Sequence, residues 1–229
     1  MIFIYSLIFV LILSLFFTSS IKKNSNNYYL ASIFIGIFTT IYEVLRITSH
    51  AKLDGFPLYI EKIFIKGHIS IALFILVMFA GALNSKWKIS RKLLSIRSEL
   101  AIISSIFIIP HALIYLVRLI VLKLPKMITT GIVPTLYIAY IIVGIIAFII
   151  MIPLFITSFK KIRCNMQNGK WRKLQKRAYI FYFLVYIHIL LILLSKKEID
   201  LLKLSSYTII FGAYTIFKLD KQSRLKIAS

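Results

Sequence analysis

Two histidines of this sequence stand inside long apolar runs, where a polar side chain needs a specific reason. His111 interrupts "SELAIISSIFIIPHALIYLVRLI", residues 98–120, and His188 interrupts "AYIFYFLVYIHILLILL", residues 178–194. A neutral imidazole nitrogen can bind iron, and a bundle of apolar helices can enclose a haem. Two such histidines on different helices therefore suggest the two axial ligands of one haem.

Position along the two runs supports this pairing. His111 comes eleven residues after Leu100, and His188 comes eleven residues after Arg177. At a rise of about 1.5 Å per residue, both imidazoles reach roughly 16 Å into the membrane. The alternative is that each histidine only hydrogen-bonds a neighbouring helix. The shared depth, slightly past the midplane, favours the haem.

The residues around His111 suit a slot for a flat cofactor. Phe107 and Tyr115 stand four residues before and after it, on the same helical face. Ala112 is small enough to permit close approach. Pro110 removes a backbone hydrogen bond next to the histidine and is expected to bend the helix.

Composition defines the elements that must hold these side chains. Hydrophobic residues make up 60% of the 229-residue chain, and its mean hydropathy is +0.90, which is typical of an integral membrane protein. We expect an all-α, polytopic transmembrane bundle of about seven helices. The expected spans are 1–20, 28–46, 65–84, 100–121, 134–157, 178–195 and a short one at 205–217.

These spans divide the chain into three parts. Residues 1–27 form an N-terminal anchor helix and loop, residues 28–217 the main transmembrane domain, and residues 218–229 a basic tail. The first span lacks a basic segment before it and is followed by Lys22 and Lys23, so we expect an uncleaved anchor rather than a signal peptide.

The charge of the chain is strongly basic, with 29 Lys and Arg against 7 Asp and Glu and a formal net charge of +22. Threading the spans alternately places 19 basic residues on one side of the membrane and 10 on the other. The positive-inside rule then predicts an external N-terminus and a cytoplasmic C-terminus, and no nucleic-acid partner is expected. The lone cysteine, Cys164, argues against structural zinc and thiol redox chemistry.

Three motifs occur in order around the two histidines. "RSELAI" begins at Arg97 and precedes His111, "PLFITS" covers Pro153–Ser158, and "WRKLQKRAY" covers Trp171–Tyr179 and precedes His188. With these motifs the chain resembles the ferric reductase-like transmembrane domain, whose patterns are "RRxLGL", "PLxxTS" and "WxxLHRxxY". Within that family it is most similar to the haem-binding membrane subunit of the bacterial periplasmic methionine sulfoxide reductase system.

The resemblance covers residues 67–195. It implies a haem-binding six-helix core over residues 28–217, preceded here by an extra N-terminal helix, and it matches His111 and His188 to the family's haem ligands. Gln175 replaces the histidine of the family's "LH" pair, so we expect one haem b rather than two. Arg97 and Arg177 are candidates to contact haem propionates or a quinone head group, although charges that only set topology are the alternative.

Three further polar positions receive weaker assignments. His68 and Gln175 are possible secondary positions of the cofactor site, and an interfacial histidine without a special role is the alternative for His68. Glu43 and Arg46, three residues apart, predict an intrahelical ion pair, with a proton relay as the alternative. His50 lies in an external loop and receives no role.

The resemblance also implies an electron-transfer function. No glycine-rich dinucleotide fingerprint is present, so we expect an oxidoreductase subunit without its own flavin or nicotinamide domain. The donor would be the quinone pool or a cytoplasmic flavin reductase. The acceptor would be an extracytoplasmic reductase protein, a flavin such as FMN or a metal. The expected location is the lipid of a bacterial cytoplasmic membrane. A non-redox assembly subunit and a small-molecule transporter are the alternatives.

Overall fold

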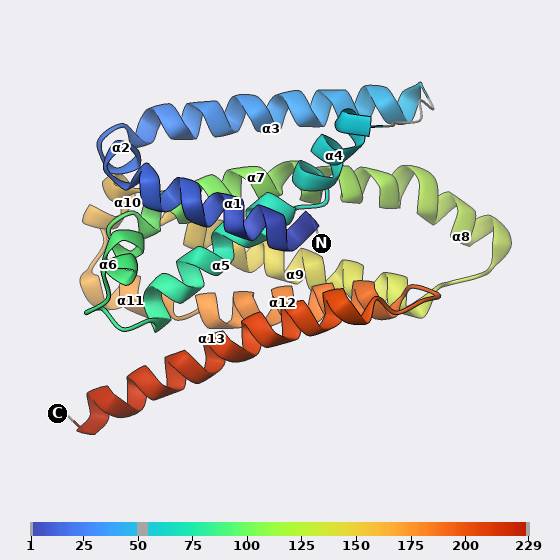
Figure 1. Ribbon diagram of the computed structural model, residues 1–229. Helices are drawn as coiled ribbons and strands as arrows, with labels where there is room; N and C mark the ends of the chain where they lie inside the picture. The colour runs from blue at the N-terminus through green and yellow to red at the C-terminus, as the bar shows by residue number, and fades with distance from the viewer. Residues whose placement is uncertain (1, 50–54, 228–229) are drawn as a thin grey trace. The chain divides into compact units, whose positions relative to one another are not determined.

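The computed structural model describes residues 2–49 and 55–227, and every regular element within these ranges is helical. This confirms the all-α prediction. Figure 1 shows the elements in order. They are α1 (Ile2–Phe16), α2 (Thr18–Lys23), α3 (Ser25–Thr48), α4 (Gly55–Phe64), α5 (His68–Ala82), α6 (Lys88–Ser95), α7 (Arg97–Arg118), the π-helical turn η1 (Leu119–Lys123), α8 (Leu124–Thr130), α9 (Thr135–Ile156), α10 (Lys160–Cys164), α11 (Asn168–Gln175), α12 (Ala178–Leu194) and α13 (Leu201–Ile227).

Four stretches are long and apolar enough to cross a membrane: Ser25–Thr48, Arg97–Thr130, Thr135–Ile156 and Asn168–Leu194. The shorter apolar helices α1 and α5 fall within two further expected spans. The helices therefore indicate a multi-pass membrane protein. The number of seven crossings and their orientation stay predictions.

Two elements differ from the expected pattern. Helix α4 was not predicted, and the left-handed Gly67, with φ of 74°, separates it from α5. The helix that contains the predicted last span, 205–217, is longer than that span, because α13 runs from Leu201 to Ile227, and it is not among the four stretches named above. The segment after Phe217 contains neither glycine nor proline, so nothing in it stops the helix.

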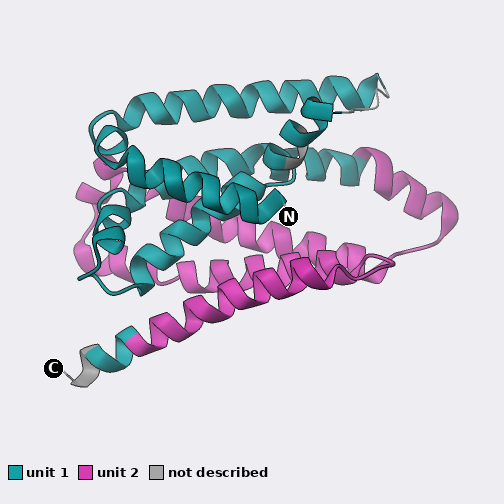
Figure 2. Cartoon of the chain, viewed as in Figure 1, with its two compact units in different colours: residues 1–120, 221–229 teal, residues 121–220 magenta. Residues whose placement is uncertain are grey.

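The chain forms two compact units, coloured separately in Figure 2. Unit 1 contains residues 1–120 and 221–229, and unit 2 contains residues 121–220. The boundary falls within η1, where the regular α-helical hydrogen bonding of α7 changes. His111 belongs to unit 1 and His188 to unit 2.

Unit 1 is built around α5, in which 11 of 15 residues are buried. A reciprocal pair of hydrogen bonds joins α5 to the antiparallel α7. Ser70 Oγ donates to the Ser104 carbonyl (2.8 Å), and Ser104 Oγ donates to the Ser70 carbonyl (2.7 Å). Because both partners are buried in apolar surroundings, these bonds fix the register of the two helices.

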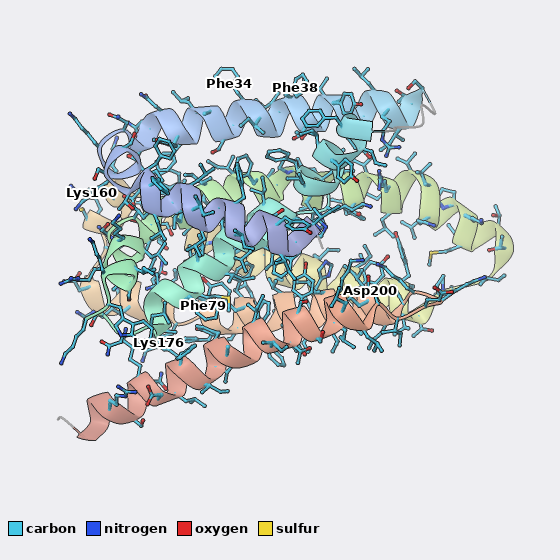
Figure 3. All side chains as sticks on the ribbon, viewed as in Figure 1. Phe34, Phe38, Phe79, Lys160, Lys176 and Asp200 are labelled. Atoms are coloured by element: carbon cyan, nitrogen blue, oxygen red, sulfur yellow. The ribbon has the colours of Figure 1, made fainter. Side chains whose placement is uncertain are left out.

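Helix α3 packs beside α7 within the same unit. Gly36 permits this approach, since a Cβ there would lie 3.4 Å from Pro110 Cγ. On the other side of α3, Phe34 and Phe38 project outward (Figure 3) and are 71% and 69% exposed. Two such aromatic rings form a surface suited to lipid rather than water.

Unit 2 is organised by α9 and α12, which pack against each other in antiparallel directions. Helix α13 lies along α12, where the Tyr186 hydroxyl and Thr208 Oγ1 are 3.1 Å apart. The rings of Tyr182 and Tyr214 make an edge contact farther along the same pair of helices. The pair of α9 and α12 positions the second histidine.

Candidate functional site

His111 is held by the backbone of the turn between α4 and α5. Its Nδ1 lies 2.8 Å from the carbonyl oxygen of Ile65. A carbonyl can only accept, so Nδ1 donates and Nε2 carries the lone pair of the ring. This is the tautomer in which Nε2 can bind a metal.

Gly67 shapes the turn that holds His111. Its φ of 74° lies in the left-handed region that favours glycine, and this turn brings the Ile65 carbonyl to α7. A Cβ at Gly67 would make an ordinary contact with His111 Nδ1 (3.6 Å) and a tight one with Ile108 Cδ1 (3.2 Å). The glycine therefore serves the turn more than the space beside the imidazole.

Tyr115 contacts the His111 ring from the next turn of α7. Its ring centroid lies 4.7 Å from that of His111, with the two planes tilted by 40°. The structure thus brings together two residues whose four-residue spacing predicted a shared face. Phe107 contacts Phe64 of α4 at 5.4 Å between centroids and packs on the apolar core of unit 1. Its expected contact with a cofactor stays a prediction.

His188 is oriented in the same way within unit 2. Its Nδ1 lies 2.7 Å from the carbonyl oxygen of Tyr140 on α9. The carbonyl is again the acceptor, so Nε2 again carries the lone pair. Histidines that bind metals almost always donate their other ring N–H to a carboxylate, a backbone carbonyl or water.

Gly144 explains how a helical carbonyl can receive this bond. A side chain on a helix covers the turn that precedes its own Cα, so a larger residue at position 144 would cover the carbonyl of Tyr140. A Cβ at Gly144 would lie only 2.8 Å from His188 Cε1 and 2.9 Å from Nδ1. The imidazole therefore occupies the space that the missing side chain leaves.

Each of the two units offers one imidazole as a metal ligand, and a backbone carbonyl accepts the hydrogen bond from its Nδ1–H. Within residues 2–49 and 55–227, no three His, Cys, Asp or Glu side chains gather as a group that could hold a metal ion. A haem needs only its axial ligands from the protein. Both histidines fit that requirement, since each presents the metal-binding tautomer on a fixed ring.

Arg97 contacts the C-terminal end of α5. Its Nε donates to the Val77 carbonyl (3.2 Å), and a Cβ at Gly81 would lie 3.3 Å from the guanidinium carbon. Lys221 Nζ donates to the carbonyls of Gly81 (3.2 Å) and Leu83 (2.9 Å) at the same end. Two cations thus stabilise the carbonyl end of α5. The expected contact of Arg97 with a propionate or quinone stays a prediction.

The substitution Arg97→Met is expected to lower the free energy of unfolding by about 1 kcal/mol, because it removes a charge-assisted bond to a helix carbonyl. Thermal unfolding in detergent measures this effect, and Arg172→Met on the exposed face of α11 is the control. Haem content is measured in parallel. Loss of haem at an unchanged unfolding temperature would instead make Arg97 a cofactor contact.

Gln175 holds α11 against the end of α9. Its Nε2 donates to Thr157 Oγ1 (3.2 Å), and Trp171 Nε1 donates to the Thr157 carbonyl (3.3 Å). Residues of the "PLFITS" and "WRKLQKRAY" motifs therefore meet at Thr157. This contact gives Gln175 a structural role, and its secondary place in a cofactor site stays a prediction.

The two remaining candidates lie at helix starts. His68 is the first residue of α5 and is partly buried, and Arg177 is exposed directly before α12. Their assignments stay predictions.

Sequence reasoning missed the carbonyls of Ile65 and Tyr140 and the space beside Gly144. The lone glycine of the apolar run "TLYIAYIIVGIIAFII" was the available signal.

Comparison with known proteins gives independent evidence on the family of this chain. The family described as ferric reductase like transmembrane component matches residues 66–193, a range that includes both histidines and both glycines beside them. An uncharacterized protein of Treponema pallidum (strain Nichols) is 31% identical over an alignment of 160 residues, and this alignment covers 66% of the present chain. The aligned part spans 42% of that relative's length. No solved structure gives a significant match.

Proposed function

This chain belongs to the ferric reductase like transmembrane family, and on that premise we propose that it is a multi-pass membrane electron carrier that binds one b-type haem. His111 and His188 would hold this haem through their imidazoles. The family suggests redox electron transfer within a membrane, and the proposal adds the cofactor, its ligands and its partners.

One observation supports the ligand assignment most directly. Both histidines direct Nδ1–H to a backbone carbonyl, at 2.8 Å for Ile65 and 2.7 Å for Tyr140. A histidine that only linked neighbouring helices would satisfy the ring with any partner, whereas the same tautomer on both rings suits two ligands of one kind. Gly144 leaves the His188 ring the room to keep this orientation, and the turn at Gly67 presents the Ile65 carbonyl to His111.

When bound, a haem with two imidazole ligands supplies one-electron transfer, because its iron alternates between Fe(III) and Fe(II) and has no open axial position for oxygen. The protein residues fix the rings, exclude water through the apolar helices around them and set the local electrostatics. Tyr115 contributes a ring in contact with His111.

The proposal also names an electron donor on the cytoplasmic side of the membrane and an electron acceptor on the outer side. We place the chain in a bacterial cytoplasmic membrane with its N-terminus outside, from the unequal distribution of basic residues. The donor is a quinol or a cytoplasmic flavin reductase. The acceptor is an extracytoplasmic reductase of the methionine sulfoxide reductase type, or a ferric or flavin acceptor. Co-purification of the full chain with its partners distinguishes these acceptors.

The test of the proposal is optical. The protein is expressed with sufficient haem, purified in detergent, and its visible spectrum is recorded before and after reduction with dithionite. We expect the bands of a low-spin b-type haem, at one haem per chain by the pyridine haemochrome assay. Protein that is folded but has no reducible haem band would contradict electron transfer and favour the non-redox assembly subunit.

A further inference from the structure

Three charged side chains form a cluster between α3 and α7 that the proposed function does not use. The Glu43 side chain is fully buried. Its Oε2 accepts a hydrogen bond from Arg46 Nε (2.8 Å), and its Oε1 accepts one from Arg46 Nη2 (2.5 Å) and another from Arg118 Nη2. The sequence predicted the pair of Glu43 and Arg46 but missed Arg118.

Among the described side chains, two guanidinium groups meet the Glu43 carboxylate. The arginine side chains are only 23% and 24% exposed. Charges that are shielded from water act over longer distances than surface charges do. The charge of Arg118 is therefore felt by groups packed nearby.

Arg118 links this charge to His111 along one face of α7. Its guanidinium carbon lies 5.4 Å from the ring centroid of Tyr115, and that centroid lies 4.7 Å from the centroid of His111. The three residues stand at positions 111, 115 and 118, the spacing of neighbours on one helical face. The order of contact is therefore Glu43, Arg118, Tyr115 and His111.

We propose that Glu43 is a positioning residue that holds Arg118 over Tyr115, and that Arg118 thereby raises the reduction potential of a haem bound by His111. The inference rests on the proposed function. Reduction adds one electron from the donor to the iron, and a nearby positive charge stabilises the reduced form relative to the oxidised one. Glu43 lies in α3, outside the residues that match the family, so the inference concerns a part of the chain that the family match does not cover.

The first test is the midpoint potential of the haem in the purified full chain. Arg118→Met is expected to lower the potential, because it removes a positive charge close to Tyr115 and His111. Arg118→Gln is the second variant, since its amide can still donate to Glu43 and support folding. The control is Arg163→Met, which removes an arginine that also stacks on an aromatic ring, Trp171, at 5.6 Å. It is expected to leave the potential unchanged.

The second test asks whether Glu43 positions Arg118. The shift caused by Arg118→Met is measured in the wild type and in the Glu43→Gln background. We expect a smaller shift in the second background, because Arg118 is no longer held there. Equal shifts would show that Glu43 does not position Arg118.

The outcomes separate this inference from the proposed function. A wild-type protein without haem refutes the proposed function. A wild-type protein with haem, whose potential is the same in Arg118→Met, Arg118→Gln and Arg163→Met, overturns the inference and leaves the proposed function standing. A role of the cluster in folding alone would lower the unfolding temperature of these variants without shifting the potential, and it would therefore also overturn the inference.

Discussion

Purified His188→Ala protein is expected to lack a stable bis-imidazole haem spectrum, and His111→Ala protein is expected to lack it as well. Each substitution removes the only group of its unit that we assign to the iron. Loss of an outer partner of a metal ligand already lowers affinity by about 10- to 100-fold, and removal of the ligand itself is expected to exceed that range. The measurement is the reduced-minus-oxidised spectrum together with haem per chain.

The control for both variants is His50→Ala. His50 lies outside the described residues, and the sequence gives it no role, so its haem content is expected to equal that of the wild type. Circular dichroism of all three variants checks that the helices form. An unchanged spectrum in His111→Ala or in His188→Ala would remove that histidine from the ligand pair.

Gly144→Ala is expected to disturb the site almost as strongly, although it only adds one methyl group. The new Cβ would lie 2.8 Å from His188 Cε1 and 2.9 Å from Nδ1, both well inside a normal contact. Either the ring moves off the Tyr140 carbonyl or α9 and α12 separate. Overpacking of this kind costs about 1–3 kcal/mol, and loss of the carbonyl bond is expected to weaken haem binding by roughly 10- to 100-fold.

The matched control is Gly212→Ala in α13, where nothing lies within 4 Å of the added Cβ. The same substitution there is expected to raise stability by up to about 1 kcal/mol, because alanine favours a helix more than glycine does. Haem titration and thermal unfolding in detergent compare the two variants. Gly144→Ala protein that kept its full haem affinity and its unfolding temperature would show that His188 does not need the space beside the glycine.

Much of the fold could be predicted because the apolar runs are long enough to cross a membrane as helices. Helix α5 falls within the predicted span 65–84, and the contact between His111 and Tyr115 followed from their four-residue spacing. Helix α4 did not, since its ten residues begin with glycine and contain a proline, a composition that indicates a loop as readily as a helix.

The site was only partly predictable, because the partners of its histidines are backbone carbonyls. Every residue has a backbone carbonyl, so the sequence does not show that the carbonyls of Ile65 and Tyr140 accept these hydrogen bonds. The pairing of Arg118 with Glu43 joins residues 75 positions apart, and helical spacing predicts only near neighbours. Spacing did predict the contact of Glu43 with Arg46.

Gly67 and Gly144 also bear on how this protein could be altered by mutation. A saturation scan scored for haem retention would find few intolerant acids or amides around the histidines, since no polar side chain there is assigned to orient them. It would instead find two intolerant glycines. At Gly144 an added Cβ meets the His188 ring, and at Gly67 the φ of 74° disfavours any residue with a side chain. Retention of haem therefore depends, at these two positions, on the absence of a side chain rather than on a polar neighbour.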